Sequence, residues 1–119
     1  MSFRFLEFKV YKDAKALHKD IVFLTRKFPR DFYYLKDQIR RSSLSIVLNV
    51  AEGSAKTSDK DFRRYLENAM GSANETASAL DVAFSEELVG KDKFEFDLDL
   101  CRSIVNQLGG FAKKLGVAG

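Results

Sequence analysis

Apolar side chains recur along most of the chain at alternating intervals of three and four residues. That spacing places side chains on one face of an α-helix, so each run predicts an amphipathic helix. The first run consists of Val10, Ala14, Leu17, Ile21, Leu24 and Phe28, and the last of Phe94, Leu98, Cys101, Val105, Leu108, Ala112 and Leu115. Between them lies a long run formed by Phe62, Leu66, Ala69, Ala73, Ala77, Leu80, Phe84 and Leu88.

Residues that start or stop helices separate these runs. Pro29 ends the first helix, because proline disfavours the α conformation in the residue before it and donates no hydrogen bond. Ser58 and Asp92 are each followed three residues later by an acidic residue. This spacing is typical of a capping box, and it predicts the start of two further helices. Gly90 is expected to stop the helix that precedes the last one.

The segment from about residue 31 to residue 52 predicts the remaining helix, and its apolar surface is unusually wide. One face carries Leu35, Ile39, Ser43, Ile46 and Val50, and Leu44, Val47 and Ala51 extend it. A helix that is apolar around most of its circumference is normally buried around most of it. We therefore expect a second contact surface there, most simply with a copy of the same chain. The alternative is that loops or the aromatic N-terminus, with Phe3, Phe5 and Phe8, cover this face.

Four amphipathic helices with short connections predict an all-α fold, an antiparallel up-and-down four-helix bundle. The 119 residues suffice for one domain over residues 1–119, with a core of its own. No period-2 run bounded by turn residues indicates a strand.

Charge changes this picture, because its distribution is uneven. The formal net charge is +3, yet residues 26–64 hold ten Lys/Arg against five acids, and residues 65–101 hold two against nine. Such polarity favours a polyanionic partner or head-to-tail contact between copies. The candidate nucleic-acid-binding residues flank the connection between the second and third helices and are Arg40, Arg41, Lys56, Lys60, Arg63 and Arg64.

A narrow polar stripe crosses the apolar second helix. Arg41, Ser45, Asn49 and Glu52 follow one another at intervals of four, four and three residues. Buried polar groups of this kind need hydrogen-bond partners, so the stripe predicts a structural network that fixes helix register or a subunit contact. A ligand site is the rival interpretation.

The sequence offers no catalytic apparatus, and we expect neither an enzyme nor a cofactor or metal site. His18 is the only histidine and follows a core position, and no glutamate has a histidine three residues after it, as a di-iron bundle requires. Glycine-rich phosphate loops are missing. Cys101 lies in an apolar run, where a small core hydrophobe is expected. A lone cysteine, no leader and no apolar run long enough for a bilayer predict a cytoplasmic protein.

The string from Gln38 to Ile46, continued by Asn49-Val50-Ala51-Glu52-Gly53, resembles the bacterial four-helix-bundle family encoded by intervening sequences of 23S ribosomal RNA genes, which is described as ribosomal protein-like. Supporting matches extend over nearly the whole chain and include Phe8-Lys9-Val10-Tyr11, Phe28-Pro29 and Gly71-Ser72. The family often has Ile-Pro-Ser-Asn where this chain reads Ile46-Val47-Leu48-Asn49. Without that proline, the second helix is expected to be straighter.

The resemblance implies a cytoplasmic ring, a homopentamer, with a suspected role in binding RNA or DNA. By analogy with a related accessory bundle, it also implies a reverse transcriptase or other nucleic-acid enzyme as a possible partner. The family motif positions that carry over are Arg40, Arg41, Asn49, Glu52, Gly71 and Glu75. Of these, Asn49, Glu52, Gly71 and Glu75 are assigned to the structural or oligomer network. The competing interpretation is a protein-protein interaction scaffold or accessory subunit without direct nucleic-acid contact.

Overall fold

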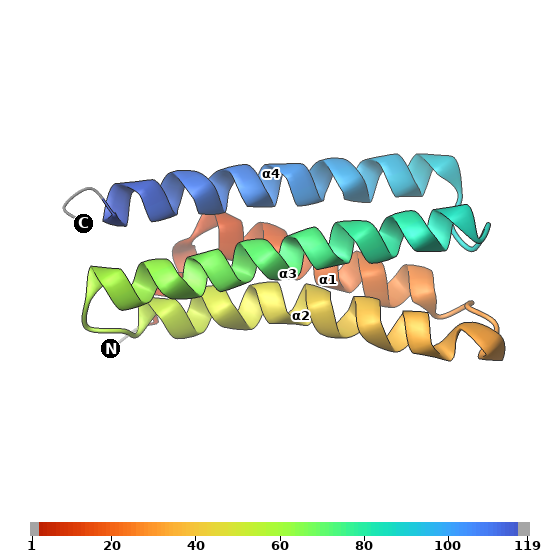
Figure 1. Ribbon diagram of the computed structural model, residues 1–119, viewed down its shortest axis with the longest axis horizontal. Helices are drawn as coiled ribbons and strands as arrows, with labels where there is room; N and C mark the ends of the chain where they lie inside the picture. The colour runs from red at the N-terminus through yellow and green to blue at the C-terminus, as the bar shows by residue number, and fades with distance from the viewer. Residues whose placement is uncertain (1–2, 117–119) are drawn as a thin grey trace.

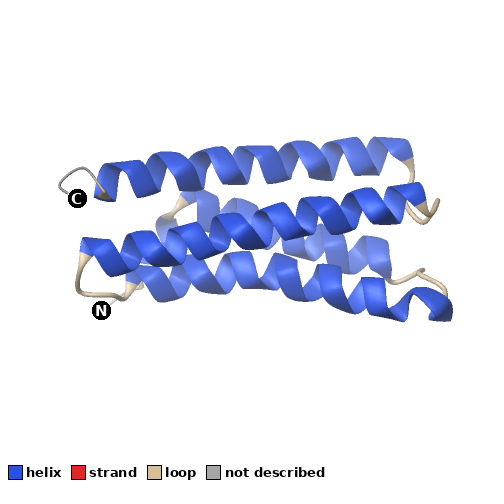
Figure 2. Cartoon of the chain, viewed as in Figure 1, coloured by secondary structure: helices blue, strands red, loops and turns tan. Residues whose placement is uncertain are grey.

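The computed structural model describes residues 3–116 and is built from four long helices (Figure 1). They are α1 (Lys9–Thr25), α2 (Tyr33–Ser54), α3 (Asp59–Ser85) and α4 (Lys91–Leu115). Two single-turn 3₁₀ helices, η1 (Arg4–Glu7) and η2 (Arg30–Phe32), precede α1 and α2. The connections are short, and no strand occurs within residues 3–116 (Figure 2). The predicted antiparallel four-helix bundle is confirmed; the two ends of the domain predicted over residues 1–119 lie outside the described residues.

The helices form a four-membered ring in cross-section. α1 packs against α2 and α4, and α3 packs against the same two helices from the opposite corner. The contact between α1 and α4 is the least extensive of the four, and α1 is the shortest helix. α2 continues without a break through Val47 and Leu48, where the family's proline often stands.

The core follows the predicted stripes with one systematic shift. In α1, four predicted core positions are buried. At the end of the helix Leu24 was expected in the core, but it is only half-buried and its neighbour Thr25 is buried instead. In α4 the most buried line is Asp97, Cys101, Ile104, Leu108 and Ala112. The predicted Phe94, Leu98, Val105 and Leu115 flank it and are half-buried. Each helix packs against two neighbours, so its most buried residues lie between the two sides of the helix that face them.

One helix start was predicted correctly and two other boundaries were not. The Ser58 hydroxyl accepts a hydrogen bond from the Asp61 N–H at 3.1 Å, as a helix cap does. Gly90 is the residue that precedes α4, so Asp92 lies within the first turn, where a carboxylate favours the helix dipole. The chain reverses after α3 at Glu87, whose φ of 62° is left-handed, and not at Gly90.

Two carboxyl groups meet inside the α1–α4 contact. Asp97 of α4 is 0% exposed, and no N–H or hydroxyl donor of a described residue reaches either of its carboxyl oxygens. Its neighbour is the carboxyl of Asp20 in α1, which Lys93 approaches at 3.5 Å. Burial, then the hydrogen bond and charge of Asp20, raise the pKa of Asp97 to about 8. Lys93 opposes this shift only in part, so the raised pKa favours the protonated form of Asp97 at pH 7.

This pair predicts that the fold weakens as the solution becomes alkaline. The folded pKa of Asp97 lies above its unfolded value, so this contribution is complete below about pH 4 and is lost as pH rises towards 8. We expect the free energy of unfolding to fall by up to about 1.4 kcal/mol per pH unit between about pH 5 and 8. Asp97→Asn should flatten this slope, because an amide can donate to Asp20 without ionising. Urea titrations across that range measure it, and the exposed Asp81→Asn is the control. A slope retained in Asp97→Asn would contradict the assignment.

Candidate nucleic-acid interface

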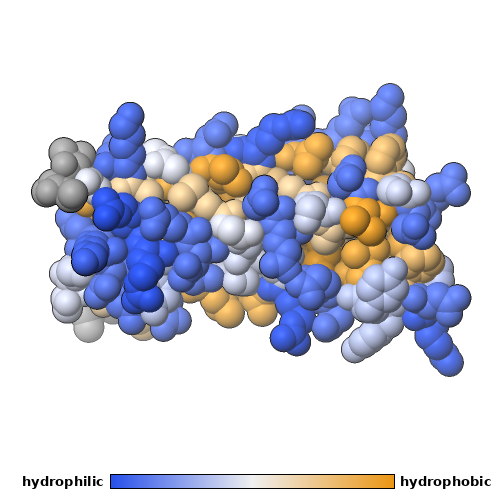
Figure 3. All heavy atoms as spheres, in the orientation of Figure 1, coloured by the Kyte–Doolittle hydropathy of each residue, from blue (hydrophilic) through white to orange (hydrophobic). Residues whose placement is uncertain are grey.

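One end of the bundle collects segments that are far apart in the sequence. The up-and-down order places the start of α1, the end of α2, the start of α3 and the end of α4 together, on the left in Figure 1. Ring contacts join three of these segments, because Phe8 lies 6.4 Å from Phe62 and 5.1 Å from Phe111 between ring centroids. Hydrophilic side chains gather over the start of α3 at this end (Figure 3).

This gathering produces a cluster of cations that we call the basic end. Its members are Arg4, Lys56, Lys60, Arg63, Arg64, Lys113 and Lys114. Four of them were predicted from the sequence, and Arg4, Lys113 and Lys114 come from the two ends of the chain. Local charge density could not reveal these three, because only the topology brings them to the end of the bundle where α3 begins.

The basic end is ordered by aromatic and backbone contacts more than by ion pairs. Lys56 and Arg64 both lie over the ring of Tyr65, each 5.0 Å from its centroid. Arg64 also approaches Asp61 at 3.8 Å, and Arg63 donates to the carbonyl of Gly116 at 3.3 Å. Arg4 lies over Phe62 and donates to the carbonyl of Ser54 at the end of α2. These charged heads are held in place and keep donors available to a ligand.

The remaining two predicted cations lie elsewhere. Arg40 and Arg41 precede the end of α2 by more than three turns, which at 1.5 Å per residue is about 20 Å. Arg40 donates to the Thr25 hydroxyl at 2.8 Å and to the Val22 carbonyl at 3.0 Å. Arg41 is exposed, 4.0 Å from Asp37. The six predicted residues therefore do not form one patch, because a helix separates charges that look adjacent in the sequence.

A hydroxyl network joins α2 to α3 where the polar stripe was predicted. Asn49 donates to the backbone and hydroxyl of Ser45, and the Ser45 hydroxyl lies 2.8 Å from that of Ser72. One turn away, the Thr76 hydroxyl donates to that of Ser42 at 2.8 Å, and both residues are buried. Each polar group thus has a partner across or along the helix pair, as a structural network requires.

The other residues assigned to that network lie outside it. Glu52 is exposed, and its carboxyl group makes no hydrogen bond or ion pair with a described residue. Glu75 is exposed too and accepts a hydrogen bond from Gln38. Gly71 faces open space, since a Cβ there would meet no atom within 4 Å.

The wide apolar surface of α2 is only partly covered within the chain. Val47 is buried, but Leu44 and Leu48 are 40% and 54% exposed. They line a groove of about 600 Å³ between α2 and α1, opposite Tyr11 and Ala16. The N-terminal segment packs at the end of the bundle and leaves this groove open, so it does not provide the cover considered above.

The side chain of His18 is half-buried and that of Cys101 is buried. His18 lines the groove, and its Nδ1 lies 2.8 Å from the Ser43 hydroxyl. Burial, followed by the charge of Arg40, lowers the pKa of His18, so the ring is neutral at pH 7. Burial and the neighbouring Asp97 raise the pKa of the Cys101 thiol to about 12. A protonated, buried thiol packs as a small apolar side chain.

The hydrogen bonds from Arg40 to Thr25 and Val22 of α1 predict that Arg40 contributes to the stability of the fold. Arg40→Ala leaves the hydroxyl of Thr25 without this donor and removes a bridge from α2 to α1, so the free energy of unfolding should fall by about 1 to 2 kcal/mol. Arg41→Ala, its exposed neighbour, should change it by less than about 0.5 kcal/mol. Chemical denaturation of both variants tests this. Equal effects of the two substitutions would contradict it.

No helix within residues 3–116 combines the length and the hydropathy that crossing a membrane requires.

Comparison with known proteins identifies a structural relative. No curated protein matches the chain. A protein of unknown function from the S23 ribosomal protein family of Bacteroides thetaiotaomicron has a similar crystal structure, with 26% sequence identity and a TM-score of 0.80. The similarity covers 87% of this chain and 98% of that one.

The family model described as 23S rRNA-intervening sequence protein matches residues 6–110. This match includes the string from Gln38 to Gly53 on which the resemblance was based, and it reaches into all four helices. The chain therefore belongs to the 23S rRNA-intervening sequence protein family.

Proposed function

We propose that this protein is a non-enzymatic bundle that binds RNA or DNA through its basic end. The observation that carries the proposal is the convergence of cations from the N-terminal segment, the α2–α3 connection, the start of α3 and the end of α4 on one end of the molecule. Lys60, Lys113 and Lys114 have no ion pair with a described residue. Cations without a protein partner are free to replace the counterions of a phosphate backbone.

The opposite end of the bundle carries many acidic residues on α3 and α4, so the charge of the molecule is polarised from end to end. The end of α3 and the start of α4 carry Asp81, Glu86, Glu87, Asp92, Glu95 and Asp99. A polyanion approaching the molecule is attracted to one end and repelled from the α3–α4 side of the other. The link of the family to 23S ribosomal RNA genes is consistent with a nucleic-acid partner, but it does not identify one.

A charge-matched pair of triple variants tests nucleic-acid binding. Lys60→Ala with Arg64→Ala and Lys113→Ala removes three cations from the basic end. For an RNA duplex, we expect weaker binding and a log–log salt slope smaller by up to about 3. The control is Lys27→Ala with Arg30→Ala and Lys91→Ala, which removes three exposed cations from the other end. It should retain both the affinity and the salt slope of the unaltered protein. Fluorescence anisotropy measures each. Equal loss in both triples, or no binding by the unaltered protein at about 50 mM salt, would overturn the proposal.

We also propose that copies of the chain assemble through the α1–α2 groove, with the homopentamer implied by the family as the expected form. Leu44 and Leu48 are large apolar side chains that the described residues leave 40% and 54% exposed. Contact with another copy would bury them and would repeat the basic end around a ring. A repeated cluster neutralises more phosphates than a single one, so assembly would strengthen nucleic-acid binding.

Self-assembly predicts that a charge in the groove dissociates the oligomer without unfolding the chain. Leu48→Glu should reduce the mass in solution to that of one chain, because a carboxylate in an apolar contact loses its hydration. Val82→Glu is the control, since Val82 is 45% exposed on α3, outside the groove. Sedimentation velocity or native mass spectrometry reports the mass. A monomeric unaltered protein would refute assembly.

The same groove favours a second candidate function, a protein-interaction scaffold or accessory subunit. In that case the groove receives another protein, for which a reverse transcriptase is the analogy, and the basic end only adds solubility. This function would be favoured by a purified partner protein whose complex with the monomer survives nuclease treatment and does not form with the Leu48→Glu variant.

A further inference from the structure

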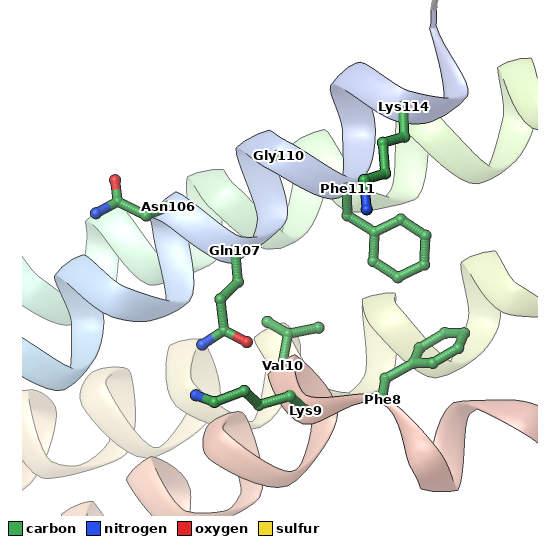
Figure 4. Close-up of a pocket in the computed structure, with 8 residues that line it drawn as sticks. All are labelled: Phe8, Lys9, Val10, Asn106, Gln107, Gly110, Phe111 and Lys114. Atoms are coloured by element: carbon green, nitrogen blue, oxygen red, sulfur yellow. The ribbon is translucent and has the colours of Figure 1, made fainter.

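A pocket of about 410 Å³ opens beside the basic end, between the start of α1 and the end of α4 (Figure 4). Its apolar walls come from Phe8, Val10 and Phe111, and its polar groups include Gln107 and Lys114. In Figure 4 the rings of Phe8 and Phe111 turn towards each other, while Gln107 hangs from α4 towards α1. This volume is in the range of small-ligand sites.

The amide of Gln107 is fixed so that only its oxygen is free. Nε2 donates to Asp13 at 2.8 Å and to the Ser103 hydroxyl at 3.2 Å, which uses both of its hydrogens. Burial raises the pKa of Asp13, but its hydrogen bonds with Lys9 and Gln107 outweigh burial and lower it overall. Asp13 is therefore a carboxylate at pH 7 and can only accept. No described residue donates to Oε1 of Gln107, so the pocket presents a preoriented acceptor.

A third aromatic ring supports the wall of the pocket, and the space at Gly110 is open. Phe8 and Phe111 meet edge to face at 5.1 Å, and Phe62 lies against Phe111 at the same distance. Both pocket rings are half-buried, so each has an exposed part that can contact a ligand. Gly110 lines the pocket, and a Cβ placed on it would meet no atom within 4 Å. The absence of a side chain at residue 110 keeps the space beside Gln107 clear.

We propose that this pocket binds an unpaired nucleobase, with the base against Phe8 and Phe111 and its phosphate at Lys114. A flat aromatic ligand suits the two rings, because base–aromatic contacts tolerate any base. Each base carries an N–H on its Watson–Crick edge, and Oε1 of Gln107 accepts from it. In a duplex that N–H is already paired and the base is stacked. The pocket therefore gives the protein a preference for single strands, which rests on the proposed function and specifies its substrate class.

Substitution at Gly110 tests the pocket without removing a charge or a core contact. Gly110→Leu fills the space beside Gln107, and replacing a helical glycine does not lower helix propensity. We expect the unaltered protein to bind a 12-nucleotide RNA more tightly than the same RNA annealed to its complement. Gly110→Leu should weaken single-strand binding about tenfold and leave duplex binding unchanged. Gln107→Met, which removes the acceptor, should weaken single-strand binding in the same direction.

Gly71→Leu is the matched control, because Gly71 is also helical and a Cβ there also meets no atom within 4 Å. It should retain the preference for single strands. In a separate measurement, adenosine monophosphate should shift the amide resonances of Gly109 and Gly110 in an NMR titration of the unaltered protein, but not those of Gly71.

The outcomes separate this inference from the proposed function. If nucleic acid binds but Gly110→Leu keeps the preference for single strands, the pocket assignment is wrong and the basic end remains. If no RNA binds while adenosine monophosphate shifts Gly110, the proposed function fails and the pocket remains. If neither ligand has an effect, both are overturned.

Discussion

The close approach of α3 to its two neighbours is the constraint on which the rest of the structure depends. Ala69, Ala73 and Ala83 of α3 are all 0% exposed, so the backbones of α2 and α4 can lie near that of α3. The contact at the end of α2 is tighter still. A Cβ on Gly53 would come within 2.7 Å of the Cβ of Tyr65, a distance that real side chains do not adopt. Small residues therefore set the spacing of the bundle, and that spacing fixes which helix ends meet.

Polar groups inside this spacing give the helix pair its register. The hydroxyls of Ser42 and Thr76 bond to each other in the buried layer, and Ser45 and Ser72 repeat the arrangement one turn away. Sliding α3 along α2 by one turn would break both of these contacts, and only one pair of hydroxyls could meet again in the new register. The lost hydrogen bond between the helices would cost about 1 kcal/mol. The apolar stripe alone permits such a slip, because its alanines are interchangeable. The hydroxyls remove this freedom and, with it, alternative placements of the basic end.

The sequence predicted the elements better than it predicted their relations. Four helices, their apolar stripes and the Ser58 cap depend on local spacing, and all are present. Asp97 was not placed in the core, since an acidic residue is normally counted as surface, and Asp20, the neighbour that helps to raise its pKa, lies 77 positions away. Likewise, Arg40 looked like part of a basic cluster because it is near others in the sequence. Its bonds to α1, and the arrival of Lys113 beside Arg63 of α3, depend on topology, which no local pattern contains.

The carboxyl pair between α1 and α4 has a consequence for the energetics of the whole chain. In the unfolded protein at pH 7 an aspartate is ionised, whereas Asp97 in the bundle holds its proton. Folding near neutral pH is therefore accompanied by net uptake of protons at Asp97 from the solution. The heat that accompanies folding then includes the ionisation heat of the buffer, so calorimetric enthalpies measured in phosphate and in Tris will differ although the structure is the same. Folding of this bundle is, in part, an acid–base reaction with its solvent.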